Sequence, residues 1–189
     1  QFAVEFPELQ AYLSGPPRPA AVLIPFLMKD DGWHLLFTRR TTALQEHSGQ
    51  VAFPGGRMDP LDENPYATAL REAQEEISLA PKDVQVLGRL NDYLTITNYL
   101  VTPVVGIMPW PYPLRASPHE VSRVFTIPLN LLANPQHHEI RQRTLPGRKK
   151  PIPVVYFQSY EGEILWGATA RFTLDLLKVL NLNGAVNEQ

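Results

Sequence analysis

Cysteine is absent from the 189 residues, and this excludes a disulfide-stapled fold, a thiolate zinc site and a cysteine nucleophile. Long hydrophobic runs are also lacking, because the longest, residues 20–28, contains Pro25 and is too short to cross a bilayer. An excess of one charge is lacking as well: 17 basic and 19 acidic side chains leave a net charge of -2. Such a balance gives no sign of nucleic-acid or membrane-surface binding. With no basic leader before the first apolar run, we expect a cytoplasmic protein.

The residues that are present predict one folded unit. Apolar residues make up 44% and aromatic residues 10% of the chain, enough for a core that offsets the entropy lost on folding. The length suits a single core. We therefore expect a single domain over residues 1–189, flanked by an N-terminal segment (1–19) and a C-terminal helix (167–181). Nothing in the sequence sets the oligomeric state.

The first part of the chain predicts strands followed by a helix. The apolar run 20–28 and a second run over 33–39 are separated by an Asp-Gly pair, which is typical of a hairpin. A third short strand is expected over 50–53, ended by a turn at Pro54-Gly55-Gly56. Apolar residues then recur at three- and four-residue steps from 65 to 79, which predicts a helix.

The remaining elements complete an α/β pattern. Asn64 and Pro65 suit the N-cap and first position of the predicted helix. Further strands are predicted over 84–90, 93–97, 100–108 and 121–128, with a last helix over 168–180 and a short N-terminal helix ending near Gly15. This order predicts an α/β fold in which a mixed sheet lies between helices.

The predicted helix over 65–79 carries a crowded set of acids. Glu72, Glu75 and Glu76 stand at i, i+3 and i+4 and therefore share one surface. Like charges at this spacing repel by about 0.2 to 0.5 kcal/mol per pair, a cost that a divalent cation would reverse. Carboxylate oxygens suit Mg²⁺ or Mn²⁺. A solvated helix face is the commoner explanation of acids alone, but the Gly-Gly segment upstream, whose bare backbone can approach a phosphate, favours a site.

Residues 56–79 resemble the Nudix box, GX5EX7REUXEEXGU with U aliphatic, most clearly in the run REAQEEISL from Arg71. Two positions differ. The gap from Gly56 is one residue too long, so that Asp62 or Glu63 must take the role of the first box glutamate. Ser78 replaces the box glycine, and since a left-handed serine would be strained, we expect the helix to end differently.

A second motif lies upstream of the box. Residues 35–40 and 47–56, LLFTRR and HSGQVAFPGG, resemble the motif of the coenzyme A pyrophosphatase branch, roughly LLTxT, four residues, then RxxxGxxxFPGG. Gln45 stands where that pattern has arginine, and Arg39 and Arg40 are the expected substitutes. The run WGATAR from Trp166 resembles the start of the branch's C-terminal helix.

This resemblance implies a Nudix-type α/β/α sandwich, with the box over about 55–79, that hydrolyses coenzyme A to 4′-phosphopantetheine and adenosine 3′,5′-bisphosphate. The implied cofactor is Mg²⁺ or Mn²⁺ and the implied partner a small molecule. The implied metal ligands are Glu72, Glu76 and Glu75; the implied catalytic residues are Glu75, Glu76 and Arg71; the implied substrate-binding residues are Arg39, Arg40, Gly55, Gly56 and Arg57. Arg71 would orient Glu75, although a plain salt bridge at this spacing is equally compatible.

Several questions stay open at this point. The general base lies on the box helix or on a later segment, where the candidates are Glu120, Glu139, Glu161 and Glu163. The substrate is coenzyme A or, alternatively, another nucleotide such as ADP-ribose, NADH or a dinucleoside polyphosphate. The third hypothesis is a Nudix-fold binding module without turnover.

A basic stretch follows over residues 141–150, with Arg141, Arg143, Arg148, Lys149 and Lys150 and no acid among them. A solvated loop is its commoner explanation. The functional hypothesis is that it holds the 3′-phosphate of coenzyme A, because arginine binds phosphate through two parallel hydrogen bonds.

Overall fold

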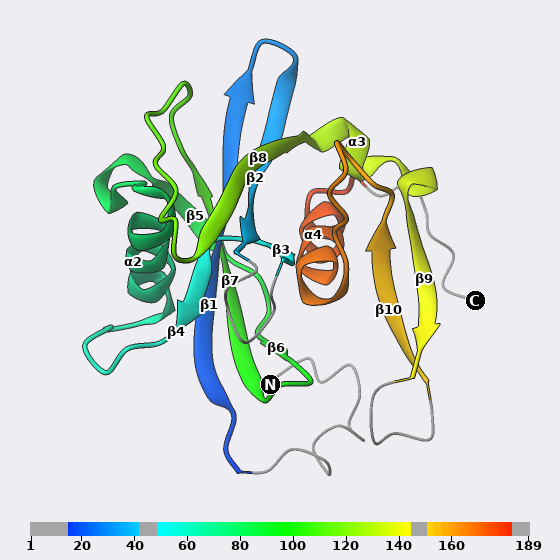
Figure 1. Cartoon of the computed structure of the whole chain (residues 1–189), viewed down its shortest axis with the longest axis horizontal. Coiled ribbons are helices and arrows are strands. Elements are labelled where there is room, and N and C mark those ends of the chain that lie inside the picture. Colours follow the sequence, from blue (N-terminus) through cyan, green and yellow to red (C-terminus); the bar gives the residue numbers. More distant parts are fainter. Residues whose placement is uncertain (1–14, 42–48, 145–150, 183–189) are drawn as a thin grey trace.

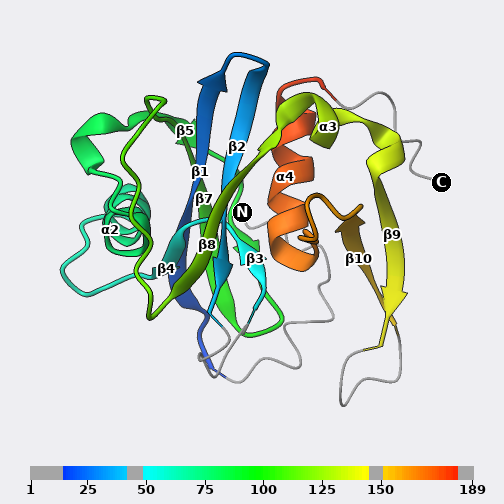
Figure 2. The ribbon, with the colours of Figure 1, turned by 45° about the horizontal axis from the view of Figure 1, so that its top comes forward.

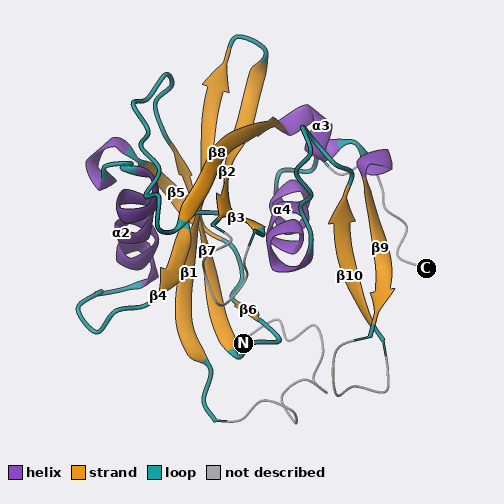
Figure 3. Cartoon of the chain, in the orientation of Figure 1, coloured by secondary structure: helices purple, strands orange, loops and turns teal. Residues whose placement is uncertain are grey.

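The structure is a computed structural model that describes residues 15–41, 49–144 and 151–182 (Figure 1). The strands of the main sheet are β1 (Arg18–Lys29), β2 (Gly32–Arg40), β3 (Val51–Ala52), β4 (Gly55–Arg57), β5 (Gln85–Arg89), β6 (Tyr93–Leu94), β7 (Tyr99–Ile107) and β8 (Val121–Pro128). The helices are α2 (Pro65–Ile77), α3 (Leu129–Ala133) and α4 (Gly167–Val179), with 3-10 turns at Pro81–Asp83 and Pro135–His137. A separate hairpin consists of β9 (His138–Arg143) and β10 (Ile152–Phe157). Figure 3 shows the distribution of these elements.

The main sheet is mixed, as predicted. Its strand order is β3-β2-β1-β7-β5, with β4 paired to β1, β6 to β7 and β8 to β2. The central strand β1 runs antiparallel to β2 and parallel to β7. A parallel pair needs a long crossover, which the chain makes through α2 before it returns as β7.

Helices cover both faces of this sheet, so the predicted α/β/α sandwich is confirmed (Figures 1 and 2). Side chains alternate along β1: Ala21 and Leu23 pack in the core on the α2 side, whereas Ile24 and Phe26 pack in the core that contains α4. This alternation is the period of a strand buried on both faces. Because of the same alternation, only every second side chain of a strand faces α2.

Helix α2 begins as the sequence predicts but ends differently from our expectation. The Asn64 side chain caps it by accepting a hydrogen bond from the Ala67 amide at 3.0 Å. Ser78 takes the left-handed conformation at φ 59°, the conformation we expected serine to avoid. Its amide donates to the Gln74 carbonyl at 3.0 Å and its hydroxyl donates to the Arg115 carbonyl at 3.3 Å. These two bonds offset the strain of a left-handed serine.

The turn predicted at Pro54-Gly55-Gly56 is wrong, because Gly55 begins the strand β4, which pairs antiparallel with β1. The glycines are needed for close approach. A Cβ atom on Gly55 would lie 2.4 Å from the Ala21 carbonyl oxygen, and one on Gly56 would lie 2.5 Å from the carboxyl carbon of Glu72. Any side chain at Gly56 would therefore clash with an acid of α2.

Other differences concern the periphery. The strand predicted over 93–97 is only Tyr93–Leu94, and neither α3 nor the β9–β10 hairpin was predicted. Part of the expected basic loop is the strand β9. The N-terminal helix, Gln45 and the segment 145–150, with Arg148, Lys149 and Lys150, lie outside the described residues. Within the described part of the chain, no helix is both long and apolar enough to span a bilayer.

Candidate active site

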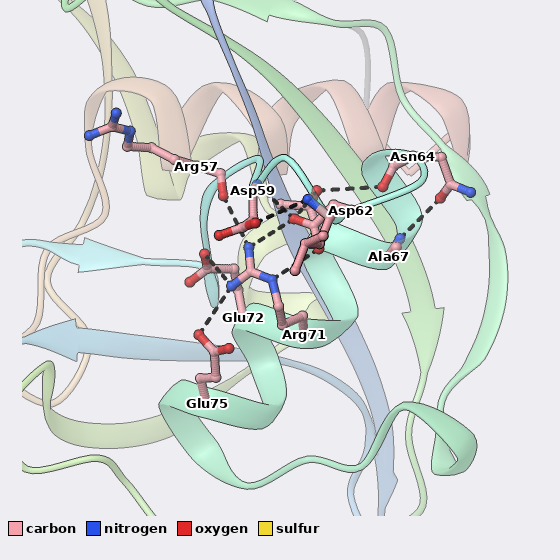
Figure 4. A network of polar contacts seen from close by, with 10 residues as sticks. Arg57, Asp59, Asp62, Asn64, Ala67, Arg71, Glu72 and Glu75 are labelled. Atoms are coloured by element: carbon pink, nitrogen blue, oxygen red, sulfur yellow. Dashed lines mark hydrogen bonds and ion pairs between the residues drawn. The ribbon is translucent and has the colours of Figure 1, made fainter.

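Arg71 is the centre of a polar network that joins α2 to the segment before it (Figure 4). Its Nε and Nη2 atoms donate to the two carboxylate oxygens of Asp62, at 3.0 and 2.9 Å. Its Nη1 donates to Glu72 at 3.0 Å and to Glu75 at 3.1 Å. Nη2 also donates to the backbone carbonyl of Arg57 at 3.1 Å, which ties the helix to β4. One guanidinium thus fixes the positions of two of the three predicted acids.

Asp62 is the anchor of this arginine. Its side chain is only 6% exposed and also accepts hydrogen bonds from the Thr68 hydroxyl and the Asp59 amide, both at 2.9 Å. The hydrogen bonds from Arg71 lower the pKa of Asp62 to about 2. Glu63 is exposed. Of the two candidates for the first box acid, the structure therefore brings Asp62 to the arginine.

Glu76 is the most deeply buried acid of the helix, with a side chain that is 5% exposed. Burial raises its pKa to about 8, although the charge of Arg40 opposes the shift, and the charges of Glu72 and Glu120 add to it. Its Oε2 atom is buried and has no hydrogen-bond partner among the described residues. A buried carboxylate oxygen without a partner is uncommon and calls for an unseen ligand or proton.

Glu72 lies next to Glu76 and against the backbone of Gly56. Its side chain is 16% exposed, and burial raises its pKa despite the adjacent Arg71. Within residues 15–41, 49–144 and 151–182, no three Asp, Glu or His side chains converge as a ready-made metal site. Glu75 is exposed and pairs with the same Nη1 of Arg71 that binds Glu72. The donor set nevertheless fits a hard divalent cation, since it offers carboxylate oxygens, one of them unpartnered, beside a backbone strand.

The predicted substrate-binding arginines do not gather in one place. Side chains alternate along β2, so that Arg40 faces α2, with its Nη1 3.8 Å from Glu76 Oε1. Arg39 points to the other face, where its Nη1 donates to Glu163 at 3.3 Å. The Arg57 side chain is exposed and points away from the network in Figure 4. Only Arg40 is brought to the acids.

The four candidates for a general base are separated in the same way. Glu120 is the one whose charge acts on both Glu72 and Glu76. The loop before it is fastened to the end of α2, where the Ser117 amide donates to the Glu76 carbonyl at 2.8 Å. The other three are engaged elsewhere: Glu161 and Glu163 with Arg123 at 2.6 and 3.1 Å, and Glu139 with Arg141.

The basic residues of β9 lie far from the acids. The guanidinium of Arg141 lies 4.6 Å from the ring centroid of Tyr156, and that of Arg143 lies 4.6 Å from the ring centroid of Trp166. In both ribbon views the hairpin lies beyond α4, on the side of the sheet opposite α2 (Figures 1 and 2). The described part of the 141–150 stretch is thus not near the acids of its own chain.

Comparison with known proteins identifies the group to which this arrangement belongs. The family model of the NUDIX domain matches residues 17–147, which include the whole sheet and α2. The chain belongs to the Nudix domain family. It is 40% identical over 173 residues to an "Uncharacterized Nudix hydrolase NudL" of Photorhabdus laumondii, an alignment that covers 90% of this chain and 89% of the relative. A protein of the same name from Yersinia pestis is 38% identical over 174 residues, covering 90% and 84%.

Solved structures agree with the Nudix fold. A Nudix hydrolase of M. smegmatis, RenU, has a TM-score of 0.60 at 17% identity, covering 93% of this chain and 92% of that one. An Ap4A hydrolase of C. elegans has a TM-score of 0.51 at 19% identity, covering 58% and 80%. These likenesses concern the fold. The family and the named relatives make the chain a Nudix hydrolase, a class of pyrophosphatases that generally use divalent cations.

Proposed function

We propose that this Nudix hydrolase cleaves the pyrophosphate bond of coenzyme A or its derivatives, with Mg²⁺ or Mn²⁺ held by Glu72 and Glu76. The observation that supports the metal site best is the buried Glu76, whose Oε2 has no partner among the described residues and which lies beside Glu72. When bound, the cation would neutralise the diphosphate and lower the pKa of a nucleophilic water. We further propose a single domain and a cytoplasmic location.

The remaining residues of the site would support this chemistry. Arg71, fixed by Asp62, holds Glu72 and Glu75 through hydrogen bonds and would keep them in place when the diphosphate binds. Glu75 is exposed and would serve as a further ligand or as the base, for which Glu120 is the other candidate. A base must lie within hydrogen-bond reach of the attacking water, and the charges of both Glu75 and Glu120 act on Glu72.

For the substrate itself, we propose Arg40 and the backbone of Gly55 and Gly56 as the main contacts, with Arg57 at the edge of the site. A guanidinium matches the geometry of phosphate oxygens, and a bare glycine backbone allows them to come close. Arg39 is not included, because its side chain is directed to Glu163.

Support for coenzyme A comes from the motif over residues 35–56, which resembles that of the coenzyme A pyrophosphatase branch. The second candidate is hydrolysis of another nucleotide, and Gln45, in place of the arginine of that motif, favours it. ADP-ribose, NADH and a dinucleoside polyphosphate are its test substrates; the last is suggested by the fold shared with an Ap4A hydrolase. A binding module without turnover is disfavoured by the intact acids Glu72, Glu75 and Glu76.

A product assay separates these functions. Purified protein with Mg²⁺ or Mn²⁺ is given coenzyme A, ADP-ribose, NADH and Ap4A, and kcat/KM is compared for the wild type, Glu76→Gln and the exposed control Glu139→Gln. We expect coenzyme A to give the highest kcat/KM, and we expect only Glu76→Gln to abolish turnover. Equal kcat/KM values would support a broader nucleotide hydrolase, and no turnover of any compound would support the binding module.

A further inference from the structure

The end of β2 presents a firmly held arginine to the acids of α2. The Arg40 amide donates to the Gln50 carbonyl at 2.9 Å, and the Arg40 carbonyl accepts a hydrogen bond from the Ser122 hydroxyl at 3.5 Å. The backbone is thus fixed by both neighbouring segments. The side chain extends from this fixed backbone to the acids of α2, and its Nη1 lies 3.8 Å from Oε1 of Glu76.

This ion pair is incomplete on both sides. A separation of 3.8 Å is too long for a hydrogen bond. Arg40 Nε and Glu76 Oε2 are both buried, and neither has a partner among the described residues. Buried polar atoms are nearly always hydrogen-bonded, so two unpartnered atoms in one ion pair indicate groups that are placed for other partners.

The neighbouring arginine shows that this geometry is not a general property of the strand end. Arg39 donates to the buried Glu163 at 3.3 Å, and Arg123 donates to the same oxygen at 3.1 Å. Both arginines lie within hydrogen-bond distance of their acid. Of the two neighbouring arginines, Arg40 is the one that lies too far from its acid for a hydrogen bond, and it faces α2 and the proposed site.

We propose that Arg40 occupies the place of a divalent cation as the counter-charge of Glu76 and transfers to the substrate's diphosphate when the cation binds. The inference rests on the proposed metal-dependent function and adds a residue that couples metal occupancy to substrate binding. A cation on Glu76 repels the guanidinium, and the diphosphate that the cation attracts offers it two oxygens in matching geometry. The transfer gives Arg40 Nε a partner and leaves Glu76 to the metal.

The direct test observes the guanidinium itself. The full-length protein is labelled with ¹⁵N-arginine, and the Nε–Hε signals of Arg39 and Arg40 are assigned with the variants Arg39→Lys and Arg40→Lys. We expect Mg²⁺ alone to shift the Arg40 signal and Mg²⁺ with α,β-methylene-ADP to protect it from hydrogen exchange, while the Arg39 signal stays unchanged. An Arg40 signal that ignores Mg²⁺, or that responds equally to the analogue without Mg²⁺, would overturn the proposal.

Affinities give an independent readout. For Arg40→Gln we expect binding of α,β-methylene-ADP to weaken about tenfold with Mg²⁺ present and to remain unchanged without it, as for the loss of one charge-assisted contact. Arg39→Gln is the matched control and should bind like the wild type in both conditions. Equal weakening in the two conditions would contradict the transfer. Thermal melts verify that each variant is folded.

Failure of this inference is distinguishable from failure of the proposed function. Binding of Mn²⁺ is measured by electron paramagnetic resonance in the wild type and in Glu76→Gln. If both bind Mn²⁺ equally, the proposed metal site fails. If Glu76→Gln loses Mn²⁺ but Arg40 does not respond to the cation, the metal site stands and only the transfer of Arg40 is wrong.

Discussion

Two clusters of arginine and glutamate lie on opposite faces of the same sheet, and they are built differently. On the α4 side, the buried Glu163 receives hydrogen bonds from Arg39 and Arg123, and Arg123 also donates to Glu161 at 2.6 Å. On the α2 side, the equally buried Glu76 has its nearest guanidinium, that of Arg40, at 3.8 Å and a hydrogen bond from the Gly55 backbone, and its Oε2 has no partner among the described residues.

The difference separates a structural role from a functional one. A buried acid that already accepts charge-assisted hydrogen bonds from the protein, as Glu163 does from two arginines, has its charge balanced within the fold. A buried acid whose partners are missing costs stability, and proteins retain such a cost mainly at functional sites. On this comparison we propose a structural role for Glu163 and a role in the reaction for Glu76.

The largest expected effect is on turnover. Glu76→Gln should lower kcat/KM by about a hundredfold or more, because it removes a proposed ligand of the cation that neutralises the diphosphate. Glu163→Gln should stay within about threefold of the wild type once folded, since Glu163 pairs with Arg39 and Arg123 on the face of the sheet opposite the proposed site. Steady-state kinetics on the best substrate measures both. Comparable losses in the two variants would erase the distinction between the clusters.

For the free energy of unfolding, Glu163→Gln should have the larger effect and Glu76→Gln the smaller. Glu163→Gln leaves two guanidinium groups without their shared carboxylate and should lower the free energy of unfolding by about 2 to 4 kcal/mol. Glu76→Gln keeps a side-chain oxygen that can accept the hydrogen bond from the Gly55 backbone, and it should change the free energy of unfolding by less than about 1 kcal/mol at pH 7. Urea unfolding measures these values. The assignment of Glu163 to the fold would be contradicted if its substitution cost no more than that of Glu76.

An intermediate effect is expected at the anchor of Arg71. Asp62→Asn weakens the paired hydrogen bonds to Arg71 and should cost about 1 to 3 kcal/mol of unfolding free energy together with activity. Because the pKa of Asp62 is lowered to about 2, its contribution is complete above the unfolded value near 3.8 and is lost as the pH falls toward 2. The wild type should therefore lose more stability than Asp62→Asn between pH 5 and 2. If the free energies of unfolding of the two proteins fell in parallel over this range, the stabilising role of the Asp62–Arg71 pair would be contradicted.

The smallest effect is a pH dependence in the absence of divalent cations. The pKa of Glu76 is raised from 4.5 to about 8, so the folded state binds this proton more tightly than the unfolded state. The resulting stability is complete below pH 4.5 and is lost as the pH rises through about 8. Melting temperatures should fall by a few degrees between pH 6 and 9, and Mg²⁺ should reverse the fall. Glu76→Gln should remove this dependence of the melting temperature on pH, and the control Glu139→Gln should keep it. If Glu76→Gln kept the dependence, a group other than Glu76 would be its cause.

Local signals in the sequence explain why much of the fold could be predicted. Alternation along β1 and β2, the helical period of α2 and the cap at Asn64 each depend on residues close in sequence. The same period placed Glu72, Glu75 and Glu76 on one surface. Glycine misled the prediction at Gly55 and Gly56, because turns and close approach both favour it, and only the neighbouring Ala21 and Glu72 decide between them.

The rest of the site depends on contacts between residues remote in sequence. The separation of Arg40 from Arg39 required knowledge of which face of β2 meets α2, and the proximity of Glu120 arises from a loop that folds back onto the helix end. The strand β9 is exposed along nearly its whole length, so it lacks the apolar alternation that would reveal it.

The most direct test of the central claim is a crystal structure of the protein soaked in Mn²⁺, with anomalous scattering used to locate the ions. We predict Mn²⁺ bound by Glu72 and Glu76, with Arg71 still paired to Asp62. Ions bound at other acids only, or Glu76 facing Arg40 with no ion beside it at saturating Mn²⁺, would contradict it.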